Sequence, residues 1–125
     1  MIMGYRFYIS GAITDNPNYV EDFERAERKI TMCAVESGLA SYDVEFINPA
    51  KVGKTLPNFG YEEYMALDLF LLSKCDAIYM IQGYEKSRGA VSELLMAKNM
   101  GLEIFYESEE LKDGRKTNVC KDNNR

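Results

Sequence analysis

One short stretch of the chain combines an anion-binding pattern with a carboxylate. Residues 87–89, Ser-Arg-Gly, follow the apolar run 77–81 and open a helical pattern that continues to residue 101. The N–H groups at the start of such a helix have no partners within it and lie at the positive end of its dipole, so they favour an anion. Glu93 follows about one helical turn later, roughly 6 Å along the axis. This spacing indicates a site that holds a phosphorylated ligand and does chemistry beside the phosphate.

Each of these residues also has an ordinary structural interpretation. Ser87 is a good helix cap, a role that uses the geometry of anion binding without excluding it. Arg88 adds a cation that suits a phosphate. Glu93 shares one helical row with Gly89 and Ala97. It could therefore stand at the exposed end of a close helix–sheet contact, which is the more common role of a lone glutamate. Its place one turn into a helix that follows a central strand favours a functional role instead.

A second carboxylate lies where a helix should be apolar. On a helical wheel that starts at Tyr61, Asp68 falls at about 340°, between Leu72 at about 20° and Tyr64 at about 300°. A carboxylate in an apolar stripe costs several kcal/mol unless it is paired or faces a polar cavity. Asp68 could form an ion pair with Arg6 or Arg88, or it could belong to a functional site. The sequence favours these two interpretations equally, because carboxyl groups are perturbed in both settings.

The elements that would position these side chains alternate along the chain. Strand patterns cover residues 5–10, 43–47, 76–81 and 102–106, and helical patterns cover about 20–34, 61–74 and 87–101. This order predicts an α/β fold, a single-domain doubly wound parallel sheet of the flavodoxin or Rossmann-like kind with helices on both faces. Residues 51–59 are expected to form a loop. The domain spans 1–106, and 107–125 form a polar tail.

Ligands of such sheets bind at the carboxyl ends of the strands. Ser10, Gly11 and Asn48 stand at such ends, so they join the candidate substrate-binding residues. The sequence predicts no cofactor and no metal site. The 125 residues include no histidine, which is the commonest metal ligand. Acid–base work then falls to carboxylates or tyrosines.

Composition also limits the partners. The net charge of −5 argues against a duplex nucleic acid. No apolar run reaches the roughly 20 residues that span a membrane, and we expect no secretory signal. The three cysteines are an odd number, which indicates reduced thiols and a cytoplasmic protein. The basic residues of 112–125 indicate a solvated end of the chain.

A set of short motifs adds a family resemblance. The ordered motifs are Tyr8-Ile9-Ser10-Gly11, Asn48-Pro49, Tyr64-Met65-Ala66-Leu67-Asp68-Leu69, Cys75-Asp76-Ala77 and the run from Gly83 to Ala90, followed by Glu93, Ala97 and Gly101. Together they resemble the nucleoside 2-deoxyribosyltransferase-like superfamily, and most closely its small bacterial and phage branch. The resemblance covers about residues 5–106. Tyr84 stands where that branch often has tryptophan.

The resemblance implies cleavage of the N-glycosidic bond of a nucleoside or deoxynucleoside 5′-monophosphate, by hydrolysis or by base exchange. Glu93 matches the carboxylate that attacks the anomeric carbon, and Asp68 matches the one that manages the proton of the leaving base. Tyr8 and Gly11 match pocket residues near the sugar and base. Ser87 and Gly89 match phosphate contacts.

The resemblance also implies a homodimer or higher homo-oligomer, because related enzymes complete the pocket with a residue near the C-terminus of a neighbouring subunit. Residues 112–125 do not match that pattern clearly. A non-catalytic module that binds or senses a nucleotide is therefore the alternative function.

Overall fold

The computed structural model of the chain describes residues 4–36, 44–56 and 58–107. The predicted α/β fold is confirmed, with strands and helices alternating along this part of the chain. The elements are β1 (Tyr5–Ser10), α1 (Tyr19–Glu36), β2 (Val44–Ile47), α2 (Pro49–Thr55), α3 (Tyr61–Leu72), β3 (Ala77–Met80), the short 3₁₀ helix η2 (Tyr84–Lys86), α4 (Arg88–Met100) and β4 (Glu103–Tyr106).

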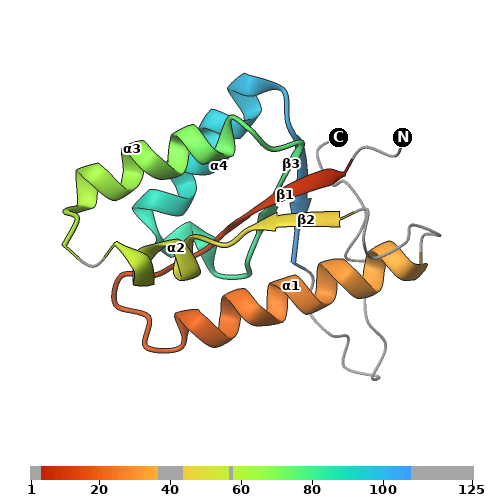
Figure 1. Ribbon diagram of the computed structural model, residues 1–125, viewed down its shortest axis with the longest axis horizontal. Helices are drawn as coiled ribbons and strands as arrows, with labels where there is room; N and C mark the ends of the chain where they lie inside the picture. Colours follow the sequence, from red (N-terminus) through yellow and green to blue (C-terminus); the bar gives the residue numbers. More distant parts are fainter. Residues whose placement is uncertain (1–3, 37–43, 57, 108–125) are drawn as a thin grey trace.

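The four strands form one parallel sheet in the order β2-β1-β3-β4. β1 is central and pairs with β2 from Tyr5 opposite Val44 and with β3 from Phe7 opposite Ala77. α1 covers one face of the sheet, and α3 and α4 cover the other (Figure 1). The chain leaves neighbouring strands β1 and β3 toward opposite faces, so a crevice opens at their carboxyl ends.

Alternate residues of the strands enter two separate apolar clusters. In β3, Ile78 and Met80 join the cluster under α4, whereas Ala77 and Tyr79 join the cluster under α1. All four are buried, as expected for a strand that is covered on both faces. The same alternation in β1 turns Tyr8 toward α4. Because side chains two apart on a strand share a face, Ser10 also faces α4.

One element contradicts the sequence prediction. Residues 49–55 form the helix α2 where a loop was expected. The Asn48 side chain accepts a hydrogen bond from the Ala50 N–H at 3.0 Å, which caps this helix, and Pro49 occupies its first position, where no N–H is needed. The dipeptide that was interpreted as the end of a strand is therefore also the start of a helix.

The predicted ends of α4 are confirmed. The Ser87 hydroxyl accepts a hydrogen bond from the Ala90 N–H at 3.1 Å. Gly101 ends the helix with a φ of 78°, a left-handed conformation that glycine adopts without the steric cost of a Cβ.

The prediction of three reduced thiols is wrong for Cys33, which is disulfide-bonded, whereas Cys75 is free and buried. That prediction had supported a cytoplasmic location. Helices of the described ranges are all too short or too polar to cross a membrane. The basic segment 112–125 lies outside the described residues.

Candidate functional site

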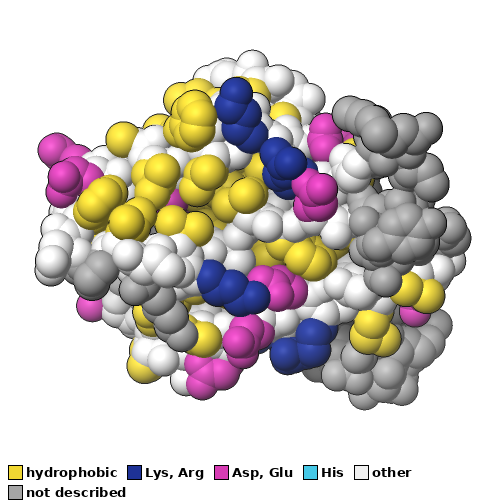
Figure 2. All heavy atoms as spheres, viewed as in Figure 1, with side chains coloured by type: hydrophobic (Ala, Val, Ile, Leu, Met, Phe, Trp, Pro, Cys, Tyr) yellow, Lys and Arg dark blue, Asp and Glu magenta, His cyan; other side chains and the backbone are white. Residues whose placement is uncertain are grey.

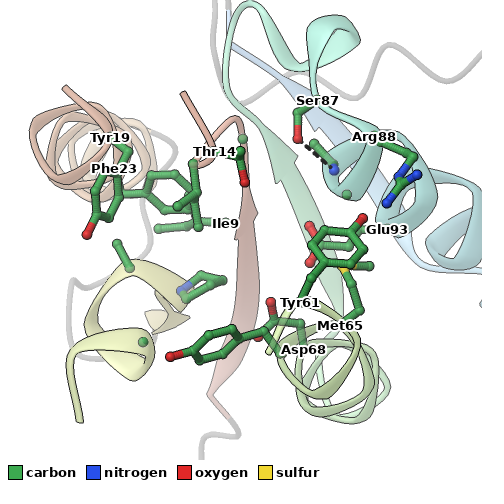
Figure 3. Close-up of a pocket in the computed structure, with 18 of the residues that line it drawn as sticks. Ile9, Thr14, Tyr19, Phe23, Tyr61, Met65, Asp68, Ser87, Arg88 and Glu93 are labelled. Atoms are coloured by element: carbon green, nitrogen blue, oxygen red, sulfur yellow. Dashed lines mark hydrogen bonds between the residues drawn. The ribbon is translucent and has the colours of Figure 1, made fainter. Parts of the chain in front are cut away.

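A cavity of about 550 Å³ lies at the carboxyl ends of the strands. Its walls come from the loop after β1, from α1 and α2, and from the facing helices α3 and α4 (Figure 3). This volume lies in the range of small-molecule sites. The lining residues are Ile9, Gly11, Ile13, Thr14, Asp15, Tyr19, Phe23, Pro49, Ala50, Gly53, Tyr61, Tyr64, Met65, Asp68, Lys86, Ser87, Arg88, Gly89, Ala90 and Glu93.

Glu93 is a buried carboxylate in the wall of this cavity, with only 6% of its surface exposed. Ser10 Oγ donates a hydrogen bond to its Oε1 at 2.6 Å, and Tyr8 Oη donates one to its Oε2 at 2.7 Å. Burial raises the pKa of Glu93 to about 7. The hydrogen bonds from Ser10 and Tyr8 oppose that rise, and the nearby negative charge of Asp68 adds to it. Glu93 is not at the exposed end of a helix–sheet contact, so the more ordinary interpretation of this residue is wrong.

Tyr8 connects Glu93 with Asp68. Its side chain is fully buried, and burial, followed by the negative charges of Glu93 and Asp68, raises its pKa well above the usual value. The phenol therefore keeps its proton and remains a donor. It supports the cavity from behind Glu93, since it is not one of the lining residues.

Asp68 lines the same cavity from α3 (Figure 3). Burial raises its pKa to about 6, and the nearby hydroxyl of Tyr8 opposes that rise. Neither cation considered from the sequence pairs with it in the described structure, because Arg6 contacts Glu45 at 2.9 Å and Arg88 lies over the ring of Tyr61. The placement of Asp68 on an apolar stripe is thus explained by a cavity and not by a salt bridge.

The start of α4 forms another part of the wall. Ser87, Arg88 and Gly89 all line the cavity, together with Lys86. The Ser87 oxygen accepts the capping bond from Ala90, so its own O–H is free to donate to a ligand. The first N–H groups of a helix have no partner within it, so donors and cations gather at this end.

Gly11 and Asn48, two predicted substrate-binding residues at strand ends, have different roles in the structure. Gly11 lines the cavity, and a Cβ at this position would lie 2.9 Å from the Cβ of Ile81, so no larger residue fits without displacing the chain after β3. Asn48 does not line the cavity. Its oxygen caps α2, and its Nδ2 donates to Glu27 Oε2 at 2.8 Å.

The sequence analysis missed most of the apolar wall. Tyr19 and Phe23 extend from α1 toward the cavity, and Tyr61 and Met65 extend from α3 (Figure 3). These aromatic and apolar residues have the spacing of ordinary core positions, so periodicity alone does not separate them from the core. Pro49 and Ala50 could have been found, because Asn-Pro is a helix-start signal.

Among the residues that the structure describes, no group of three or more cysteine, aspartate or glutamate side chains could hold a metal ion. Acid–base and nucleophilic work in this cavity is available from Glu93, Asp68 and Tyr8. Donors and cations for an anion are available at the start of α4.

The chain also matches a protein-family model. A family model described as Domain of unknown function (DUF4406) matches residues 5–106, which include every element named above and the whole cavity. No curated protein matches the chain.

Proposed function

This chain belongs to the DUF4406 family, a domain of unknown function, and we propose that its cavity cleaves the N-glycosidic bond of a nucleoside or deoxynucleoside 5′-monophosphate. The observation that carries the proposal is Glu93, a buried carboxylate that receives two hydroxyl hydrogen bonds and faces the cavity beside Asp68. The described structure places no cation against Glu93 to neutralise it. Burying a carboxylate without a cation costs free energy, and a reactive role for Glu93 accounts for that cost.

The proposed reaction has two steps. A Glu93 oxygen attacks C1′ of the sugar, the C1′–N bond breaks, and the leaving base takes a proton from Asp68. Water, or a second base, then attacks C1′ and gives up a proton to Asp68, and the bond from C1′ to Glu93 breaks. The two displacements replace one difficult step, as in retaining glycosidases.

The hydrogen bonds of Tyr8 support this division of roles. A phenol has one proton to donate, and Tyr8 directs it to Glu93. A close contact from Tyr8 to Asp68 is then favourable when Asp68 carries a proton of its own. The two carboxyl groups titrate as a pair. Their pKa values of about 7 and about 6 favour the shared proton on Glu93 in the free protein. The reaction therefore requires the other state, with a proton on Asp68 and a charge on Glu93, in which Glu93 accepts both hydroxyl bonds.

The 5′-phosphate belongs, in this proposal, at the start of α4. Lys86, Arg88, the Ser87 hydroxyl and the first N–H groups of the helix supply charge and donors there. The base then occupies the apolar part of the cavity, where Tyr19 and Phe23 offer aromatic surface. This arrangement leaves the sugar between the two ends, next to Glu93.

The test is release of free base from a panel of ribo- and deoxyribonucleoside 5′-monophosphates, followed by chromatography. We expect release by the wild type and none by Glu93→Gln, whereas the exposed Glu85→Gln is the matched control and keeps full activity. Equal release by wild type and Glu93→Gln contradicts the proposal. Nucleotide binding in calorimetry without any release supports the alternative, a nucleotide-sensing module.

Self-association is part of the proposal. α3 also exposes apolar side chains, and hydrophobic side chains gather over it (Figure 2). Phe70 on this helix is 59% exposed. Light scattering of the purified protein tests for a homodimer or higher homo-oligomer, and a monomer at all concentrations contradicts it.

A further inference from the structure

Arg88 and Tyr61 meet at the edge of the cavity. They are the first residues of α4 and α3, and the guanidinium carbon of Arg88 lies 5.0 Å from the centre of the Tyr61 ring. This is the geometry of a cation–π contact, in which the ring attracts the flat face of the guanidinium. Both side chains line the cavity and approach each other from facing helices (Figure 3).

Gly89 lies where α3 and α4 pack closely beside this contact. A Cβ on Gly89 would lie 3.3 Å from the sulfur of Met65 and 3.7 Å from the hydroxyl oxygen of Tyr61. The first turn of α3 therefore lies close against the first turn of α4. A Cβ at position 89 would press on the Met65 sulfur, whereas its distance to the Tyr61 hydroxyl is that of an ordinary contact.

The contact leaves the donor edge of Arg88 free. The ring of Tyr61 occupies a face of the guanidinium, whereas hydrogen bonds to an anion use the N–H groups at its edge. In the described ranges, the arginines that form salt bridges are Arg6 and Arg25, and Arg88 pairs with no carboxylate. An arginine held by an aromatic ring, with its charge not neutralised, is arranged to receive an anionic ligand.

We propose that Tyr61 is a positioning residue that holds Arg88 at the α4 end of the cavity, so that the site selects nucleotides with a 5′-phosphate over the same nucleosides without one. The inference rests on the proposed function, because it assigns the selectivity of the same cavity. Tyr61 acts through Arg88 and not by contact with the reacting atoms. A flexible arginine loses side-chain freedom when it binds, and one that is already held loses less.

The experiment measures two dissociation constants by calorimetry for each variant, one for a deoxynucleoside 5′-monophosphate and one for the matching deoxynucleoside. All four common bases are used. The ratio of the two constants is the selectivity for phosphate. We expect Arg88→Ala to lower this ratio about tenfold or more, since a hydrogen bond to a charged group is lost. Tyr61→Leu lowers it roughly two- to fivefold, as expected for an exposed cation–π contact.

Three further variants separate positioning from a general effect on structure. Tyr61→Phe keeps the ring and restores the ratio of the wild type. Tyr61→Leu adds nothing when it is combined with Arg88→Ala, because Tyr61 has no other route to the phosphate. Phe70→Leu is the matched control, because it removes a second cation–π contact of α3, that of Lys74 Nζ at 5.4 Å, outside the cavity. It leaves the ratio unchanged.

The outcomes distinguish the inference from the function on which it rests. If nucleotides bind and the selectivity is the same in Tyr61→Leu as in wild type, the role of Tyr61 is refuted while the proposed function stands. If Tyr61→Leu lowers selectivity as much in the Arg88→Ala background as alone, Tyr61 does not act through Arg88. If neither the nucleotides nor inorganic phosphate bind, both proposals are refuted.

Discussion

Glu93 and Glu107 are buried to nearly the same extent, at 6% and 8% exposure, yet their surroundings differ in every other respect. Glu107 follows β4 and faces α1, where Arg25 contacts both of its oxygens at 2.9 and 3.1 Å and Lys29 lies at 3.1 Å. It also accepts the Gln82 N–H at 2.9 Å. Among the described residues, Glu93, on the opposite side of the sheet, receives hydrogen bonds only from the neutral hydroxyl groups of Tyr8 and Ser10.

The pKa values follow these surroundings. Burial alone would raise both, but the hydrogen bonds and charges of Arg25 and Lys29 lower the pKa of Glu107, whereas the pKa of Glu93 rises to about 7. Burial therefore does not distinguish the paired carboxylate Glu107 from Glu93, the carboxylate that we propose to be reactive. The presence of a cation does, because it neutralises the charge that chemistry would use.

The substitution with the largest expected effect is Glu93→Gln. It removes the proposed nucleophile, and we expect base release to fall by a factor on the order of 10³ or more. Stability, measured by urea unfolding at pH 8, stays the same or increases, because a buried charge is lost. A large loss of both activity and stability would place Glu93 with Glu107 as a structural residue.

Asp68→Asn comes next. It removes the proposed acid, and we expect a loss on the order of 10² in the rate of base release. In the wild type, the rate of base release should be highest between about pH 6 and about 7, where the pair holds one proton, and should fall on either side. The variant should lose the alkaline fall and keep its acid limb close to that of the wild type, because Asp68 is already uncharged in the proposed active state. An unchanged pH profile excludes this coupling.

Glu107→Gln should affect stability and leave chemistry intact. We expect a loss of about 2 kcal/mol in urea unfolding at pH 7, since charge-assisted hydrogen bonds are lost, although the partial exposure of Arg25 limits the effect. The pKa of Glu107 is lowered in the folded state, so its contribution is present above about pH 4.5 and is lost as the pH falls. The variant should therefore lose less stability in acid than the wild type.

Glu93 should give the opposite slope. Its folded pKa is raised, so the wild type loses stability as the pH rises from about 4.5 to about 7, and Glu93→Gln removes that loss. Unfolding of both glutamine variants across this range, with Glu85→Gln as the exposed control, gives a direct comparison of the two buried carboxylates.

The smallest effect is expected for Ser10→Ala. The Ser10 hydroxyl lowers the pKa of Glu93, so its removal raises that pKa further and moves the acid limb of base release to higher pH. We expect a roughly fivefold lower rate near pH 6.5, the size of one ordinary hydrogen bond. Ser10→Thr keeps the hydroxyl and is the control. A rate equal to that of the wild type would show that Tyr8 alone positions Glu93.

Much of the fold followed from local patterns. The alternating elements, the cap at Ser87 and the glycine that ends α4 are all short-range signals, and each is confirmed. α2 was missed because Asn48-Pro49 stops a strand and starts a helix with the same two residues. Glu107, assigned to the tail from its polar neighbours, lies buried against α1, a contact between positions far apart in the sequence.

The candidate site was predictable where a residue contradicted its local pattern. Asp68 could be selected because a charge stood on an apolar stripe, and the structure places it in the cavity with Glu93. Tyr61 and Phe23 conformed to their patterns and could not be selected. Within the described part of the chain, no cation lies beside Glu93, because Arg6, Arg25 and Arg88 contact other groups. A local sequence pattern does not contain those positions.

The raised pKa of Glu93 has a consequence for binding heats. The carboxyl pair changes its protonation close to neutral pH, and the sequence has no histidine to exchange protons in the same range. A ligand that alters the charge next to this pair should take up or release protons as it binds. The heat of binding will then depend on the ionisation enthalpy of the buffer. Calorimetry in two buffers that differ in this enthalpy, neither of them phosphate, would count those protons.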